Sequence, residues 1–127
     1  MAKYNNQGLD HVAIGVADVE RSRRFYADVL GFERAHEAWD RPVVMAAGES
    51  GVAIFDRHGE PATDDGDPPP ARILHIAFRV DREGLERART ELAERGLEVE
   101  FSDHGISHSI YFPDPDGHRL ELTTYEV

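Results

Sequence analysis

The sequence contains no cysteine. This absence excludes disulfide bonds, thiolate nucleophiles and zinc sites built from cysteine, so histidine and carboxylate are the strong metal ligands that remain. Basic residues are also scarce, with 14 Lys and Arg against 25 Asp and Glu. The resulting net charge of −11 is unfavourable for binding nucleic acid, which depends on basic patches that neutralise phosphates.

Long hydrophobic runs are missing as well. No apolar stretch approaches the roughly 20 residues that a membrane-spanning helix needs. The first residues lack the basic region and apolar core of a signal peptide, so we expect a cytoplasmic protein without a membrane partner. At 127 residues and 40% hydrophobic content, the chain is expected to form a single domain, residues 1–127.

The chain repeats itself. The segments Leu9–Val16 and Ile73–Val80 are both apolar, rich in β-branched residues and carry a histidine in third place, so both are predicted strands. After each comes an aspartate suited to capping a helix, a stretch with helical spacing of apolar residues, and a glycine that ends it. These caps and stops are Asp18 with Gly31 and Asp81 with Gly96.

Each half then continues with a short extended stretch and a β-hairpin. The turns are predicted at 48–51 and 114–117, where glycine or proline is present. We therefore predict an α+β fold of two βαβββ modules in tandem, about residues 8–56 and 72–126. An acidic, proline-rich linker, residues 57–71, is expected to join them.

The repeat also predicts a metal site. Superposing the last strands at Gly51 and Gly117 sets Phe55 opposite Glu121. Full symmetry would supply four ligands, but only His11, His75 and Glu121 can bind a metal, and each interrupts an apolar strand, where a lone polar group is costly. Two histidines and a carboxylate suit a divalent ion with open coordination positions. The alternative is that each histidine is a half-buried residue bonded to the backbone.

Three motifs resemble the vicinal oxygen chelate superfamily, which includes glyoxalase I, fosfomycin and bleomycin resistance proteins, epimerases and extradiol dioxygenases. The motifs are Leu9–Ala13, Val19–Phe32 and Tyr111–Glu121. The resemblance covers nearly the whole chain and implies paired βαβββ modules with metal ligands at His11, His75 and Glu121. The four-ligand enzymes of the family are disfavoured by Phe55.

Residues 103–112 are similar to the corresponding stretch of catechol 2,3-dioxygenases. That match implies that His104 hydrogen-bonds or protonates the substrate and that Tyr111 orients it, and it favours Fe(II) and ring cleavage. Phe55 and Ser109 are expected to line the substrate site. The histidine base of such enzymes is missing, because Ser50 and Gly51 stand in its place, with His58 downstream as a substitute.

Two other activities stay open. One is a lyase, isomerase or fosfomycin-type thiol transferase that uses Mn(II), Zn(II) or Ni(II) as a Lewis acid; Ser109 and Tyr111 match phosphonate-binding residues there, but Phe101 replaces an expected lysine. The other is a drug-binding resistance protein without catalysis. The roles of Trp39 and His108 are left open; strand alternation would point His108 away from Ser109 unless the strand begins after it.

The resemblance also implies an assembly. Each module leaves its sheet half closed, and in short members of the family the modules pair between chains. We therefore expect a homodimer with shared sites, in which His11 comes from one subunit and His75 with Glu121 from the other. The expected ligand is a small molecule.

Overall fold

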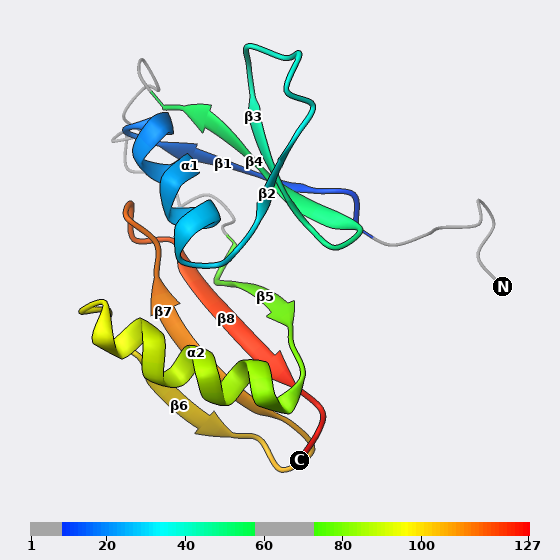
Figure 1. Ribbon diagram of the computed structural model, residues 1–127, viewed down its shortest axis with the longest axis vertical. Helices are drawn as coiled ribbons and strands as arrows, with labels where there is room; N and C mark the ends of the chain where they lie inside the picture. The colour runs from blue at the N-terminus through cyan, green and yellow to red at the C-terminus, as the bar shows by residue number, and fades with distance from the viewer. Residues whose placement is uncertain (1–8, 58–72) are drawn as a thin grey trace, which may run out of the picture. The chain divides into compact units, whose positions relative to one another are not determined.

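The computed structural model describes residues 9–57 and 73–127. The chain divides into two units, here called the first unit (residues 9–57) and the second unit (residues 73–127). Each unit is a four-stranded sheet with one helix (Figure 1). The predicted linker falls almost wholly outside the described residues.

The first unit has the order strand, helix and three strands. Its sheet order is β1-β4-β3-β2, with β1 parallel to β4 and the other pairs antiparallel. The elements are β1 (Val12–Val16), α1 (Val19–Asp28), β2 (Glu33–Ala35), β3 (Val43–Ala47) and β4 (Ser50–Asp56).

The second unit repeats this arrangement, with sheet order β5-β8-β7-β6 and β5 parallel to β8. Its elements are β5 (Ile76–Arg79), α2 (Arg82–Glu94), β6 (Glu100–Asp103), β7 (His108–Pro113) and β8 (Arg119–Thr124). The prediction of two tandem βαβββ modules is therefore confirmed.

Both helices begin at the aspartates predicted to cap them. The side chain of Asp18 accepts a hydrogen bond from the backbone N–H of Arg21 at 3.0 Å, and that of Asp81 accepts one from Gly84 at 2.7 Å. These bonds satisfy N–H groups that have no partner within the helix. The helix α1 ends at Asp28, three residues before Gly31, the glycine predicted to end it.

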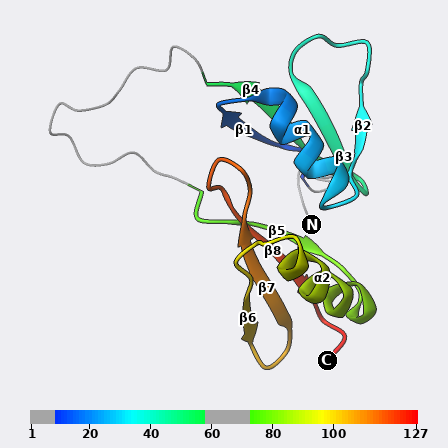
Figure 2. The same ribbon diagram turned by 60° about the vertical axis from the view of Figure 1, so that its left-hand side comes forward.

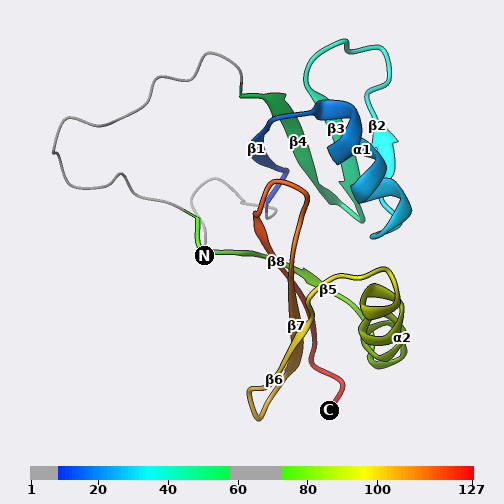
Figure 3. The ribbon, with the colours of Figure 1, turned by 90° about the vertical axis from the view of Figure 1, so that its left-hand side faces the viewer.

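Each helix covers one face of its own sheet (Figures 2 and 3). The opposite face of each sheet is the one that could hold functional side chains. In the first unit α1 buries Ser22, Phe25 and Tyr26 toward β3 and β4. In the second, α2 buries Leu85 and Leu92 toward β7 and β8. The buried strand residues beneath the helices include Met45, Val52, Ile54, Ile110, Phe112, Leu120 and Leu122.

The turn between β7 and β8 is built around a buried aspartate. Asp114 is 5% exposed, and its Oδ1 accepts hydrogen bonds from the backbone N–H groups of Asp116 and His118 at 2.9 and 2.8 Å. Gly117 takes φ of +88°, a conformation that favours glycine. This turn fixes the start of β8 and so the position of Glu121 along it.

Candidate metal centre

His75 and Glu121 come together on the second unit. In the parallel ladder of β5 and β8, Ala77 pairs with Glu121, and His75 lies two residues before Ala77 on the same face. His75 Nε2 lies 3.2 Å from Glu121 Oε1. The histidine side chain is 42% exposed and the glutamate 9%, so the pair opens to solvent on the histidine side.

The other carboxylate oxygen of Glu121, Oε2, is held by a buried serine. Ser109 Oγ donates to Glu121 Oε2 at 2.7 Å, and the Thr123 hydroxyl lies 2.9 Å from Ser109 Oγ. A serine hydroxyl has one hydrogen, so when Ser109 donates to the carboxylate, Thr123 donates to Ser109. Ser109 is fully buried. The carboxylate therefore turns Oε1 toward His75.

Tyr111 lies directly across from Glu121 in the antiparallel ladder of β7 and β8. Its hydroxyl oxygen is 3.1 Å from His104 Nε2, and its ring meets the His75 ring edge-on at 5.9 Å. Burial and the negative charge of Glu121 raise the pKa of Tyr111. The side chain therefore stays a neutral phenol that can donate a hydrogen bond.

His108 lies on the opposite face of β7 from Ser109 and Tyr111, as expected. Its ring contacts Phe101 at 5.5 Å, and its Nε2 lies 3.4 Å from Asp103 Oδ1. Phe101 is itself covered by the guanidinium of Arg89 on α2, at 4.1 Å. The residue standing at the expected lysine position thus faces the helix side of the sheet.

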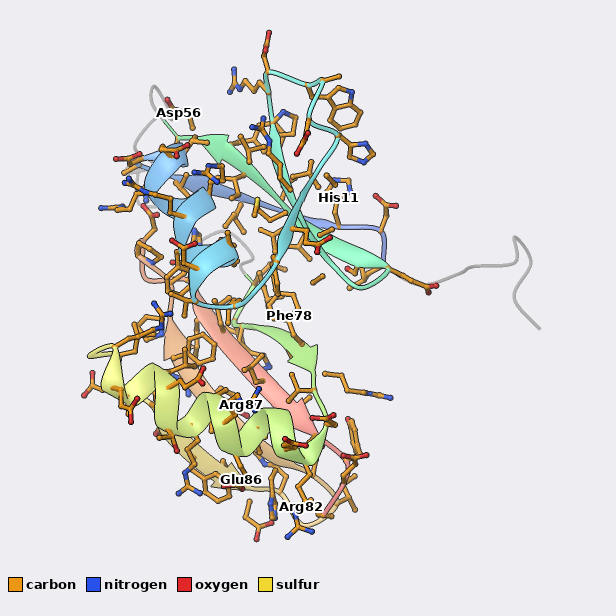
Figure 4. All side chains as sticks on the ribbon, viewed as in Figure 1. His11, Asp56, Phe78, Arg82, Glu86 and Arg87 are labelled. Atoms are coloured by element: carbon orange, nitrogen blue, oxygen red, sulfur yellow. The ribbon has the colours of Figure 1, made fainter. Side chains whose placement is uncertain are left out.

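His11 lies in the first unit and immediately precedes β1; Asp56 lies at the opposite end of the β1–β4 pair (Figure 4). His11 Nδ1 lies 2.8 Å from Asp10 Oδ2. When Nδ1 carries the proton that Asp10 accepts, the lone pair of Nε2 is available to a metal. The side chain is 48% exposed.

The ladders correct the position assigned to Phe55. Ala13, two residues after His11, pairs with Ala53, just as Ala77, two residues after His75, pairs with Glu121. Ala53, not Phe55, is therefore the counterpart of Glu121. The superposition of turn glycines was wrong because β4 starts directly after Gly48 and Glu49, whereas five residues separate β7 from β8. Alanine has no donor atom, so a fourth ligand is missing at either position.

Phe55 lies on the same face as Ala53, opposite Gly15, with the guanidinium of Arg41 5.8 Å from its ring centre. Trp39 is half exposed and stacks on His36 at 4.3 Å. The first residues of β4 are Ser50 and Gly51, so the histidine base is missing there. His58 lies outside the described residues.

Neither unit alone brings three histidine or acidic side chains into a metal-binding group within its described residues. The second unit provides two donors on one face, an imidazole nitrogen and a carboxylate oxygen, which is a suitable partial ligand set for a first-row divalent ion. Three residues that contact the candidate site residues were not predicted from the sequence: Asp10 beside His11, Thr123 beside Ser109 and Arg119 beside Tyr111. Alternation along β8 places Arg119 and Thr123 on the face of Glu121 and could have identified them.

A tandem of βαβββ units with this His–Glu pair defines the vicinal oxygen chelate class of fold. The chain belongs to the Glyoxalase/Bleomycin resistance protein/Dioxygenase superfamily, whose family model matches residues 8–122. The solved structure of a glyoxalase/dioxygenase from Nostoc punctiforme matches with a TM-score of 0.80 at 22% identity, covering 100% of this chain and 97% of that one.

Two relatives represent the activities under consideration. The glutathione transferase FosA of Serratia marcescens is 30% identical over 117 residues, which is 91% of this chain and 79% of the relative. The catechol-2,3-dioxygenase of Bacillus subtilis is 27% identical over 120 residues, which is 94% of this chain but 42% of the relative. No helix among the described residues is long and apolar enough to cross a membrane.

Proposed function

We propose that this protein is a divalent-metal-dependent enzyme that transfers a group to a small oxygen-bearing substrate or opens its ring. Its metal ligands are His11, His75 and Glu121. The observation that carries the proposal is the contact of His75 with Glu121 beside the neutral Tyr111 hydroxyl. A divalent ion bound there would polarise a substrate oxygen as a Lewis acid.

Tyr111 has the main role among the side chains of the site. When a nucleophile attacks a carbon and the carbon–oxygen bond breaks, the electron pair moves onto that oxygen. Tyr111 donates a hydrogen bond to the developing negative charge and then its proton. The nucleophile releases one proton as it attacks, and His104, 3.1 Å from the Tyr111 hydroxyl, passes that proton to the phenolate.

We assign Ser109 to holding Glu121, since its hydroxyl is buried behind the carboxylate. Phe55 is proposed to line the substrate site on the first unit. The similarity to FosA over most of both chains supports group transfer, as does the absence of a histidine at the start of β4.

The test is turnover of a small epoxide by protein loaded in turn with Mn(II), Zn(II), Ni(II) and Fe(II). Fosfomycin, a phosphonate epoxide, is the first substrate, with glutathione, L-cysteine or water as nucleophile and phosphorus NMR as the readout. Activity with redox-inert ions that is lost in Tyr111→Phe supports the proposal. Tight metal binding with no turnover of any epoxide would argue against it.

A second candidate is ring cleavage of a catechol, as in the dioxygenase relative. The hydrogen bond between His104 and Tyr111 favours it, because such a pair can orient a phenolate. The test is anaerobic loading with Fe(II) followed by catechols and oxygen, read as a yellow ring-opened product. That product would select this candidate over group transfer.

The proposed assembly is a homodimer that shares its metal sites. Light scattering at several protein concentrations measures the mass. Mixing His11→Ala with His75→Ala chains then tests sharing: if each site takes His11 from one chain and His75 from the other, mixed dimers regain one intact site in two. Failure of the mixture to bind metal would place each site within one chain.

A further inference from the structure

The turn between β6 and β7 carries His104, and an aspartate and a histidine close it on the face of the sheet opposite Tyr111. Asp103 is the last residue of β6 and His108 the first of β7, and the two face each other at the end of the ladder. His108 Nε2 lies 3.4 Å from Asp103 Oδ1. This pair therefore stands next in the chain to the histidine that passes a proton to Tyr111.

The carboxylate of Asp103 also shapes the turn. The same oxygen, Oδ1, accepts a hydrogen bond from the backbone N–H of Gly105 at 2.8 Å. The backbone N–H of His104 donates to the Ser107 carbonyl, also at 2.8 Å. These bonds fix the backbone on both sides of His104. They therefore direct its imidazole, whose Nε2 lies 3.1 Å from the Tyr111 hydroxyl.

The His108 ring is held by packing. It meets the Phe101 ring edge-on at 5.5 Å, and the guanidinium of Arg89 on α2 lies over that same ring at 4.1 Å. Asp103 on β6 is the charged group that His108 contacts, and its partner on β8, Thr124, is neutral. The side chain of His108 is 32% exposed and that of Asp103 62%. Asp103 is the freer member of the pair, so a change in the charge of His108 acts on Asp103.

The contact depends on the charge of His108. A protonated imidazole has an N–H on both nitrogens and donates a charge-assisted hydrogen bond to a carboxylate. A neutral imidazole has lost one donor and the positive charge, so its attraction for Asp103 is weaker. Oδ1 of Asp103 serves both His108 and the Gly105 N–H, so this loss reaches the turn. Histidine is the side chain that most readily changes charge at physiological pH.

We propose that Asp103 and His108 are positioning residues for His104, and that the protonation of His108 controls them. When His108 is charged, the ion pair holds Asp103 on the Gly105 N–H, and the turn keeps His104 at the phenol of Tyr111. When His108 is neutral, Asp103 is released and His104 loses this position. The inference rests on the proposed function and deepens it, because it adds a proton-dependent control of that site from the opposite face of the sheet.

The first test follows the turn by NMR in the full chain after treatment with EDTA, so that neither metal nor substrate takes part. The ring signals of His108 and the amide signal of Gly105 are recorded from about pH 5 to about pH 9, the range in which histidine charge changes. We expect a step in the Gly105 amide shift with the same midpoint as the His108 ring. A Gly105 amide without a step at that midpoint would overturn the proposal.

Two substitutions fix the charge at position 108. Lysine stays positive over this range and packs its aliphatic stem on a ring as histidine does, whereas glutamine is neutral. In His108→Lys the Gly105 amide should keep the position it has in the native chain at low pH, and in His108→Gln the position it has at high pH. Neither variant should show the step. The same amide position in both variants would contradict control by charge.

A substitution of the aspartate separates its two bonds. Asp103→Asn keeps an oxygen that accepts from the Gly105 N–H but removes the charge, so the step at the His108 midpoint should disappear while the turn remains. Ile106→Ala is the control on the same turn, since this side chain is 77% exposed, and it should leave the step unchanged. A full step in Asp103→Asn, in protein with a native circular dichroism spectrum, would show that the ion pair does not carry the effect.

Turnover tests the consequence for the reaction. His108→Gln should lower kcat by about 3- to 10-fold with KM unchanged, because a displaced proton carrier loses part of its contribution, and His108→Lys should restore it. In a His104→Gln background neither change should have a further effect, since the pair acts through His104. A further loss there would give His108 a merely structural role and overturn the proposal. Absence of any turnover would reject the proposed function, whereas the NMR result decides this inference without turnover.

Discussion

Ser109 donates its hydroxyl hydrogen to Glu121 Oε2 at 2.7 Å, while the other carboxylate oxygen lies 3.2 Å from His75 Nε2. The carboxylate therefore has one oxygen committed to the protein and one turned toward the histidine. Glu121 is expected to bind a metal through Oε1 alone.

The Ser109→Ala variant tests this arrangement. Loss of the bond leaves a nearly buried carboxylate oxygen without its donor, so metal affinity should fall by about 10- to 100-fold. The free energy of unfolding should fall by about 1–3 kcal/mol. Metal titration calorimetry and urea unfolding measure the two effects. The control is Ser102→Ala, the same change on the neighbouring strand β6; an equal loss there would argue against a specific role for Ser109.

Removing the hydroxyl of Tyr111 should affect catalysis and not metal binding. Tyr111→Phe keeps the ring between His75 and Arg119 but loses the donor to the developing oxyanion, so kcat should fall by about 10²-fold or more with metal affinity unchanged. His104→Gln should cost less. The double variant should be no slower than Tyr111→Phe alone, because His104 acts through the phenol. Additive losses would show that His104 acts independently.

Removing any one proposed ligand should remove the metal. His11→Ala, His75→Ala and Glu121→Gln should each lower metal affinity strongly. His36→Ala and His108→Ala should leave it unchanged, because the His36 ring stacks on Trp39 and the His108 ring meets the Phe101 ring edge-on. The measurement is elemental analysis of the purified protein, which should find one metal ion per chain in the native sequence. Retention of a full complement of metal by His11→Ala would remove the first unit from the site.

The fold could be predicted from local signals because each of them acts over a few residues. The capping aspartates Asp18 and Asp81 bind backbone N–H groups three residues on, and a histidine immediately precedes each of the matching strands β1 and β5. The hydrogen-bond network around Glu121 was only partly predictable, because the bond from Ser109 depends on the register between strands β7 and β8. Strand alternation gives the face of a residue but not its partner.

The register of the first unit was the clearest failure, and it leads to a last prediction. A hairpin register depends on the length of its loop, so matching turn glycines between loops of different length shifts every later position. The ladders place Ala53 at the position of Glu121. Phe55 lies two residues further, about 7 Å along the strand.

Introducing a carboxylate at each position separates the two alignments. If Ala53 is the fourth-ligand position, Ala53→Glu should bind metal at least about tenfold more tightly than the native sequence, as expected for an added ligand charge. Phe55→Glu should not. Because Ala53 is buried, the new carboxylate should destabilise the metal-free protein, and metal should raise its melting temperature more than that of the native chain. Ala53→Gln, equal in size but neutral, is the control. Tighter metal binding by Phe55→Glu than by Ala53→Glu would restore the alignment through the turn glycines.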